Sequence, residues 1–207
     1  EGTGNRRPDI VCFVNGLPLV VIEAKRPDSN KEGKSTNFEA ISQHIRNQKQ
    51  DEIPHLYAYS QLLLAINGHE GLYATCGTPE KFWAKWKEEQ IPEAEFVRLK
   101  NHTLRDEQLN ALFNHRPAKD KTDYQSLIAA GELTVTDQDR LIVSLLRPER
   151  LLDMTRLFTL FDKKAGKIVA RYQQVFGIKA LIERINTFDD TGAREGGVIW
   201  HTTGSGK

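Results

Sequence analysis

The segment Gly16-Leu17-Pro18-Leu19-Val20-Val21-Ile22-Glu23-Ala24-Lys25 joins an apolar run to a charged Glu-x-Lys ending. An apolar run of this length, bounded by Gly16 before it and Pro27 after it, predicts a buried strand. Residues 9–14 predict a second strand, and the Asn15-Gly16 dipeptide between the two is typical of a hairpin turn. The hairpin carries three charged side chains of interest, because Asp9 stands fourteen positions before Glu23 and Lys25 follows it.

The register of this hairpin decides whether Asp9 and Glu23 can meet. Side chains alternate between the two faces of a strand, and a regular two-residue loop would place Asp9 opposite Ile22, on the wrong face. A three-residue loop, residues 14–16, would place Asp9 opposite Val21 and diagonal to Glu23, on the same face. We therefore predict a bulged hairpin with the three-residue loop.

Two carboxylates and a lysine at a sheet edge suit metal-dependent chemistry on a phosphodiester. Mg²⁺ prefers oxygen ligands and uses few carboxylates, so Asp9, Glu23 and the Ala24 carbonyl are the candidate metal ligands. The metal would lower the pKa of a bound water, and Lys25 would orient that water or stabilise the transition state. Gln43 on the following helix is a further catalytic candidate. The alternative is a surface ion pair, with Gln43 a solvated helical residue.

A second pattern lies at residues 196–207, where a predicted short buried strand, residues 198–200, leads into a Gly-rich loop. The loop fits the second half of a phosphate-binding pattern, in which backbone N–H groups hold phosphates and the lysine reaches the terminal oxygens. It would bind ATP through Thr203, Gly204, Ser205, Gly206 and Lys207. The alternative is a flexible Gly-Ser loop. No carboxylate pair follows the loop to hold metal and water, so the chain alone would not hydrolyse ATP.

The other elements follow from hydrophobic period and turn residues. In chain order we first predict a helix over 38–50 with an apolar face at 38, 41 and 45, and then strands over 56–66 and 71–75. A helix starting at 77–80 would carry Phe82, Trp83 and Trp86 on one face, and helical pieces would follow within 91–130. We further predict a helix from Pro148, whose apolar positions are 151, 154, 157, 158 and 161, and a helix over 172–186.

Composition restricts the function classes. The chain has 207 residues and a net charge of +1, so bulk charge does not by itself predict a nucleic-acid partner. The longest apolar run, residues 17–22, is far shorter than the roughly 20 residues that a membrane span needs. Cys12 and Cys76 stand in apolar strand-like contexts and predict reduced cysteines, which favours a cytoplasmic protein.

Several blocks together resemble the restriction (R) subunit of type I restriction-modification enzymes. The resemblance covers nearly the whole chain, and its last block is the most specific, because His-Thr before Gly-Ser-Gly-Lys is unusual among phosphate loops. The blocks are Arg7-Pro8-Asp9, Asn15-Gly16-Leu17-Pro18-Leu19, Glu23-Ala24-Lys25, residues 61–68, Glu149-Arg150-Leu151-Leu152, Phe158-Thr159-Leu160-Phe161-Asp162, Arg171-Tyr172-Gln173 and residues 198–207.

The resemblance implies an α/β fold with three parts. Residues 1–100 would form a restriction-endonuclease-like PD-(D/E)xK domain with a mixed sheet and flanking helices, residues 101–165 a helical linker, and residues 166–207 the first strand and phosphate loop of a RecA-like ATPase domain. It also implies that the chain is a fragment, without the first helix and strand of the usual nuclease fold and without most of the motor.

The resemblance also assigns roles by position. Asp9, Glu23 and Lys25 fall on the nuclease motif, and Lys207 on the phosphate-loop lysine. Gln43 falls on the first position of a Gln-x-x-x-Tyr motif, whose tyrosine is replaced here by Asn47. Gln173 falls where the resemblance implies a glutamine near the adenine base.

The activity implied is cleavage of double-stranded DNA after ATP-driven translocation, with Mg²⁺ and ATP as cofactors and with methylation and specificity subunits as partners. Two other classes stay open. In one, residues 80–165 are a docking scaffold and the carboxylates are structural. In the other, the chain binds nucleotide and the Asp/Glu/Lys set is incidental.

Overall fold

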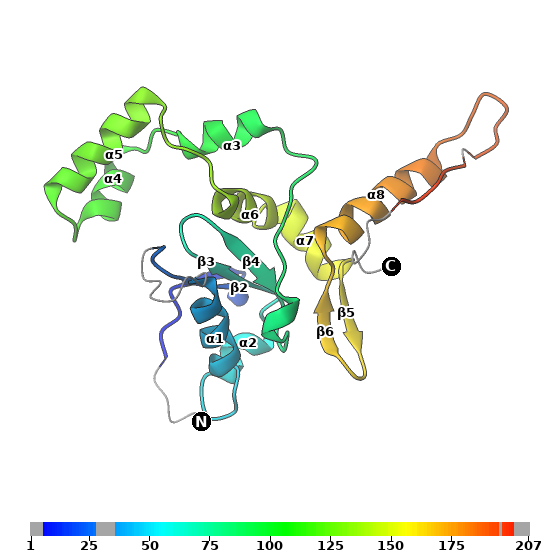
Figure 1. Cartoon of the computed structure of the whole chain (residues 1–207), viewed down its shortest axis with the longest axis horizontal. Coiled ribbons are helices and arrows are strands. Elements are labelled where there is room, and N and C mark those ends of the chain that lie inside the picture. Colours follow the sequence, from blue (N-terminus) through cyan, green and yellow to red (C-terminus); the bar gives the residue numbers. More distant parts are fainter. Residues whose placement is uncertain (1–5, 28–35, 195, 201–207) are drawn as a thin grey trace.

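A four-stranded mixed sheet forms the centre of the computed structural model, which describes residues 6–27, 36–194 and 196–200 (Figure 1). The strand order is β1-β2-β3-β4, with antiparallel, parallel and antiparallel pairing in turn. The strands are β1 (Ile10–Val14), β2 (Leu17–Ala24), β3 (Leu62–Ile66) and β4 (Gly71–Ala74). The predicted α/β class with a mixed sheet is confirmed.

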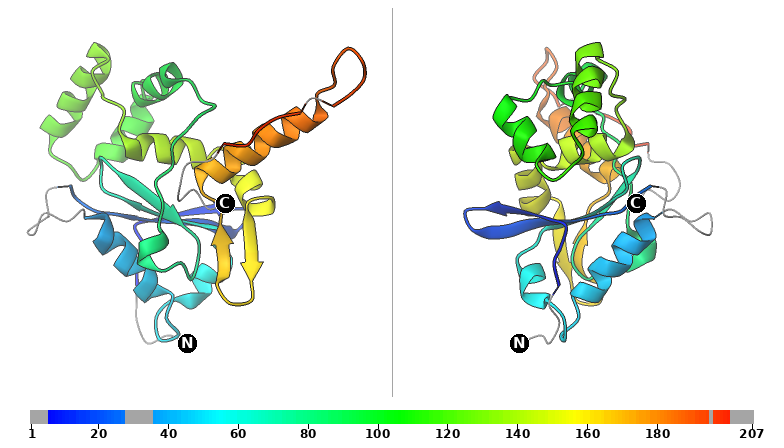
Figure 2. Two further views of the ribbon diagram at one scale, coloured as in Figure 1. Left: turned by 45° about the vertical axis from the view of Figure 1, so that its right-hand side comes forward. Right: turned by 90° about the vertical axis from the view of Figure 1, so that its left-hand side faces the viewer.

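The sheet lies between two helical layers (Figure 2), and alternate residues of its buried strands belong to two separate clusters. On one face, Val20 and Leu64 pack in a cluster with Leu141 of α6 (Asp137–Leu145) and Met154 of α7 (Pro148–Arg156). The other face packs on two helices, α1 (Asn37–Asn47) and α2 (Pro54–Ala58), through residues that include Val21. Because side chains alternate, Glu23 lies on the α1 side of the sheet with Val21.

The hairpin of β1 and β2 is bulged as predicted, but the bulge does not lie in the loop. Val14 pairs with Leu17 across a two-residue turn, and the register then shifts by one residue between Cys12 and Phe13. The predicted three-residue loop is therefore wrong. Asn15 and Gly16 both have positive φ, 49° and 80°, which is the twist that a tight hairpin turn requires.

The α1 helix forms as predicted but turns a different face to the sheet. Two of the apolar positions expected to be buried, Phe38 and Ile45, are exposed, and only Ile41 is fully buried. His44 and Asn47 are buried in their place. The apolar period was misleading because these polar side chains find hydrogen-bond partners against the sheet.

Residues 56–66 do not form one strand. Pro54 occupies the first turn of α2, which fits its fixed φ, and the strand begins only at Leu62. Ser60 separates the two elements, and its buried hydroxyl donates to the carbonyls of Pro18 and Leu56. The predicted strand at 71–75 is confirmed as β4.

The helix expected from residues 77–80 is reduced to a 3₁₀ turn, η1 (Glu80–Phe82). The chain then extends along the sheet, where Ala84 bridges to Tyr73 of β4. This extension sends Trp83 into the cluster under α1 and Trp86 into the cluster under α6, while Phe82 stays exposed. One shared aromatic face on a helix was therefore the wrong interpretation.

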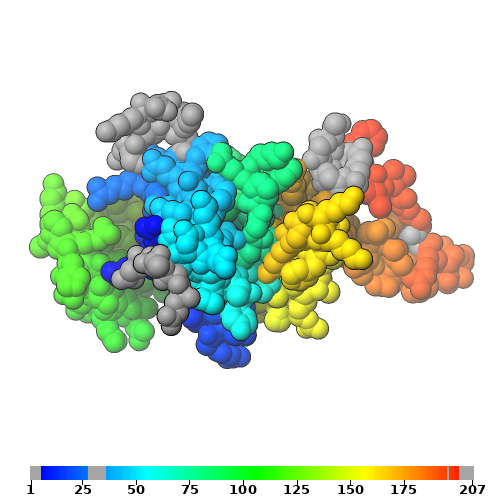
Figure 3. All heavy atoms as spheres, turned by 90° about the horizontal axis from the view of Figure 1, so that it is seen from below, coloured from blue at the N-terminus to red at the C-terminus, as the bar shows by residue number. Residues whose placement is uncertain are grey.

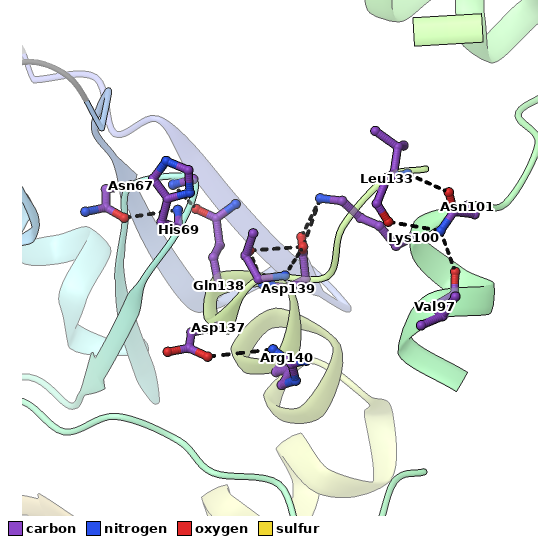
Figure 4. Close-up of polar contacts among 12 residues, drawn as sticks. Asn67, His69, Val97, Lys100, Asn101, Leu133, Asp137, Gln138, Asp139 and Arg140 are labelled. Carbon is purple, nitrogen blue, oxygen red and sulfur yellow. Dashed lines mark hydrogen bonds and ion pairs between the residues drawn. The ribbon is translucent and has the colours of Figure 1, made fainter. Parts of the chain in front are cut away.

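Residues 91–130 are helical in pieces, as predicted: α3 (Glu93–Lys100), α4 (Asp106–Phe113) and α5 (Ala118–Ala130). The next helix, α6, is tied to its neighbours at its N-terminus (Figure 4). Thr136 and Asp139 form its capping box, and Asp139 also accepts from Lys100 of α3. The Gln138 side chain accepts from the Gly68 N–H in the β3–β4 turn.

The helix from Pro148 is shorter than its apolar period predicts. It ends at Arg156, and the chain forms a second, two-stranded sheet from β5 (Thr159–Asp162) and β6 (Gly166–Val169). Phe158 is buried as expected, whereas Leu157 and Phe161 are 65% and 82% exposed.

The predicted helix over 172–186 is confirmed as α8 (Tyr172–Asn186). The short buried strand predicted over 198–200 is not formed: Val198 is 91% and Trp200 89% exposed. A buried strand needs neighbours to pair with, and no described strand pairs with this segment.

Seen from the α1–α2 side, the molecule has α4 and α5 at one end and α8 at the other, with the β5–β6 hairpin beside α2 (Figure 3). Lys167 of β6 fixes this hairpin, since its ammonium donates to the carbonyl of Ser60 and to the Gln61 side chain. No helix in the described part of the chain is long and apolar enough to cross a membrane.

Candidate functional site

The bulge brings Asp9 and Glu23 to adjacent positions on one face of the sheet. Ile10 pairs with Ile22, so the next residues outward, Asp9 and Glu23, are opposite one another. The predicted shared face is right, although Asp9 was expected opposite Val21. The Asp9 carboxylate accepts a hydrogen bond of 2.8 Å from the Ala24 N–H, which holds it against the end of β2.

Glu23 is a buried carboxylate with another carboxylate beside it. Its side chain lies on the α1 side of the sheet, and the residue is only 3% exposed. Burial raises the pKa of Glu23 to about 7, helped by the charge of Asp9 and by a hydrogen bond with it, while Lys25 and Arg46 act in the opposite direction. A site that disfavours its own negative charge in this way is stabilised when a cation arrives.

Lys25 and Gln43 contact one another directly. The Lys25 ammonium donates to Gln43 Oε1 over 2.6 Å, joining the end of β2 to α1. The Lys25 backbone N–H donates to the Ile66 carbonyl, which aligns the lysine with the edge of the sheet. The structure therefore gathers Asp9, Glu23, Ala24, Lys25 and Gln43 at one edge, four of them from a single hairpin.

Three residues that the sequence analysis did not choose as site residues complete this edge. Asn47 donates to Glu23 Oε1 over 3.4 Å, His44 Nε2 lies 3.0 Å from the Leu64 carbonyl, and the Tyr57 hydroxyl lies 3.3 Å from His44 Nδ1. Their common property is burial of a polar side chain. Asn47 and His44 are three positions apart on α1, a helical spacing that could have revealed them.

These donors match one kind of metal better than others. No group of three or more His, Cys, Asp or Glu side chains within the described ranges is arranged to hold a metal ion. Two adjacent carboxylates and a main-chain carbonyl suit Mg²⁺, which is commonly held by one or two carboxylates and keeps several waters. The residues present therefore fit a hydrated magnesium ion.

A second candidate site lies at α8, far along the chain from the first. Gln173 stands in the first turn of α8, and its Oε1 is shielded from solvent without a hydrogen bond from any described residue. A surface groove of about 850 Å³ passes over this turn and is lined also by Tyr172, Phe176 and Trp200. The proposed phosphate-loop residues, Thr203, Gly204, Ser205, Gly206 and Lys207, lie outside the described residues.

Two family models match the chain. The model for the N terminus of type I restriction enzyme R proteins matches residues 1–82, which include the carboxylate pair, Lys25 and Gln43. The model for SWI2/SNF2 ATPases matches residues 173–207, which begin at Gln173 and include the Gly-rich loop.

Curated relatives align along nearly the whole chain. A putative type I restriction enzyme MjaVIIIP endonuclease subunit of Methanocaldococcus jannaschii is 32% identical over 100% of this chain and 16% of its own length. The MjaIXP counterpart from the same organism is 30% identical over 98% of the chain and 17% of its own length. The HindI endonuclease subunit of Haemophilus influenzae is 30% identical over 99% and 16%. The chain thus spans about a sixth of the length of these relatives.

Proposed function

Because this chain belongs to the R-protein family of type I restriction enzymes, we propose that it carries the nuclease site and the start of the ATP site of such a subunit. The proposed reaction is Mg²⁺-dependent cleavage of double-stranded DNA. Its ATP-driven translocation would be performed by the ATPase that begins in residues 166–207, and methylation and specificity subunits are the proposed partners.

One observation carries the nuclease proposal: the hairpin register places Asp9 beside Glu23, at the edge where Lys25 meets Gln43. A structural ion pair would need Glu23 and Lys25 to contact one another. Instead the lysine donates to an amide, and Asp9 affects the pKa of the buried carboxylate more than any other charged group does. This arrangement leaves negative charge for a cation to neutralise.

Each residue has a proposed part in the reaction. Asp9, Glu23 and the Ala24 carbonyl would hold Mg²⁺, which when bound supplies charge neutralisation and an acidified water. Lys25 would stabilise the charge that develops on the phosphate, and Gln43 would hold the lysine in position through its 2.6 Å hydrogen bond. The Asp9–Ala24 hydrogen bond keeps the first carboxylate at the end of β2.

The nucleotide part of the proposal rests on α8. The unpartnered Oε1 of Gln173 is suited to accept from an exocyclic amine such as that of adenine, and it adjoins the groove beside Trp200. Lys207 and the preceding Gly-Ser-Gly residues would hold the phosphates. Residues 1–100, 101–165 and 166–207 are the proposed nuclease, linker and ATPase parts.

The decisive experiment measures cutting of supercoiled plasmid by the complete enzyme with Mg²⁺ and ATP. We expect Asp9→Ala and Lys25→Ala to reduce cleavage by about 100-fold or more, since each removes a group that acts on the developing charge. ATP hydrolysis should persist in both variants. Glu107→Ala is the matched control, because Glu107 is an exposed carboxylate on α4, a helix that contributes no residue to this edge.

Full cutting by both variants would show that the nuclease assignment is wrong. Nucleotide binding with no cleavage by the wild type would instead favour a nucleotide-binding role. If neither activity were found, the favoured function would be that of a docking scaffold formed by residues 80–165.

A further inference from the structure

Behind the metal-site edge, α1 and α2 contribute a line of buried polar side chains that ends on Glu23. We propose that Asn47 is a positioning residue that fixes the Glu23 carboxylate for metal binding, with Tyr57 and His44 holding Asn47 in turn. The inference rests on the proposed function, because it takes Glu23 as a metal ligand. It assigns a task to buried groups that the reaction itself does not use.

The Arg46 guanidinium, which is not part of this line, sets the orientation of the Asn47 amide. The Arg46 guanidinium donates twice to Asn47 Oδ1, over 3.2 and 3.1 Å. A guanidinium has only donors, so the atom facing it must be the amide oxygen. The amide NH₂ is then directed away from Arg46, and it donates to Glu23 Oε1. The amide cannot flip without placing its donors against a cation.

The other end of the line is equally directional. A carbonyl oxygen only accepts, so His44 Nε2 must carry the proton that it shares with the Leu64 carbonyl over 3.0 Å. Burial lowers the pKa of His44 to about 4, so the ring is neutral and Nδ1 is an acceptor. The Tyr57 hydroxyl therefore donates to Nδ1, and its oxygen is left to accept from the Asn47 side chain.

The directions of the hydrogen bonds in this line are fixed at both ends, by the Leu64 carbonyl of the buried strand β3 and by the Arg46 guanidinium. Asn47 and Glu23 are both buried, at 2% and 3% exposed, so water cannot substitute for the amide. With one carboxylate oxygen held by Asn47, the Glu23 side chain is restrained before any metal arrives. Groups that orient metal ligands in this way commonly contribute strongly to affinity.

The test measures Mn²⁺ binding to the intact chain at constant pH, without nucleotide or DNA, by titration calorimetry. Asn47→Leu keeps the branched shape of the side chain and removes the donor, and we expect its Kd for Mn²⁺ to rise about 10-fold or more. Asn47→Gln, which retains the donor, should recover part of the affinity. Tyr57→Phe, which keeps the ring but loses the hydroxyl, should also weaken binding, by less than Asn47→Leu does.

Ser60→Ala is the control, because Ser60 is a fully buried hydroxyl near the same sheet that donates only to the Pro18 and Leu56 carbonyls. Its Kd should equal that of the wild type even if its metal-free thermal stability falls.

The outcomes separate the inference from the proposed function. If the wild type bound Mn²⁺ no better than Asp9→Asn, the metal site itself would be wrong and the inference with it. If the wild type bound Mn²⁺ and Asn47→Leu bound it equally well, the metal site would stand and the positioning role would be refuted. Should Asn47→Leu fail to fold, an unchanged Kd in Tyr57→Phe would refute it as well.

Discussion

At the residue scale, Glu23 governs how the metal-free chain responds to pH. Burial, with the nearby charge of Asp9, raises its pKa from 4.5 to about 7. The folded state therefore keeps this proton to a higher pH than the unfolded chain does. The stability that protonated Glu23 contributes is fully present below pH 4.5 and is lost as the pH rises through about 7.

Glu23→Gln should remove this pH dependence, because glutamine has the shape of the protonated acid and does not titrate. In urea unfolding without divalent metal, we expect the two proteins to have similar stability near pH 5. By pH 8 the variant should be the more stable by about 1–2 kcal/mol. Parallel curves for the two proteins would show that Glu23 titrates normally.

His44 acts in the opposite direction within the same range. Its pKa is lowered to about 4 from 6.5, so its contribution is present above pH 6.5 and lost as the pH falls through 4. The wild-type curve alone would therefore hide part of the Glu23 effect. The difference between wild type and Glu23→Gln isolates it.

At the scale of single elements, the β1–β2 turn depends on a backbone conformation that L-residues rarely adopt. Gly16 has φ of 80°, and a Cβ added there would meet no atom within 4 Å. We therefore expect Gly16→Ala to cost about 1 kcal/mol through backbone strain alone. Gly196→Ala, also in open space but without positive φ, should change the free energy of unfolding little.

Urea unfolding of the two glycine variants makes this comparison. Equal stability of both would mean that the turn tolerates other backbone conformations. The register that aligns Asp9 with Glu23 would then have to be held by the bulge alone.

The α6 helix offers a second prediction at this scale. The Thr136 hydroxyl accepts a hydrogen bond from the Asp139 N–H, and the Asp139 carboxylate accepts one from the Thr136 N–H. Asp139 also accepts from Lys100, which joins α6 to α3 (Figure 4). Thr136→Ala should lower the free energy of unfolding by about 1 kcal/mol. Thr122→Ala within the exposed α5 should be neutral or slightly stabilising, since alanine is the better helix former.

Sequence patterns predicted those elements whose own residues determine them, and failed where partners decide. The strand β4, the helical pieces within 91–130 and the helix α8 followed from period and turn residues. The buried face of α1 did not, because His44 and Asn47 are buried only when the sheet supplies acceptors. The shared face of Asp9 and Glu23 was predictable, because side chains alternate along a strand. The position of the bulge was not, because the pairing between β1 and β2 decides it.

At the scale of the whole molecule, the hydrophobic core contains residues from all three of the proposed parts. One buried cluster includes Leu64 of the sheet, Leu141 and Met154 of the α6–α7 pair, and Phe176 of α8. A hydrogen bond also joins the first and last of these parts, since the Tyr73 hydroxyl of β4 donates over 2.8 Å to the Ala170 carbonyl, just before α8. The start of the proposed ATPase part is thereby anchored on the sheet of the proposed nuclease part.

This sharing predicts that the sheet and α8 lose structure together. Met154 is fully buried in the common cluster, and Met154→Ala should destabilise the chain by about 2–5 kcal/mol by leaving a cavity. Because a shared cavity weakens both sides, hydrogen exchange should accelerate in β3 and in α8 to a similar extent. Leu127→Ala on α5, where the side chain is 40% exposed, should leave exchange in both elements unchanged. Acceleration in α8 alone would mean that the helix opens independently of the sheet. The contacts of Tyr73 and Phe176 would then be too weak to couple α8 to the edge of the sheet that carries Asp9 and Glu23.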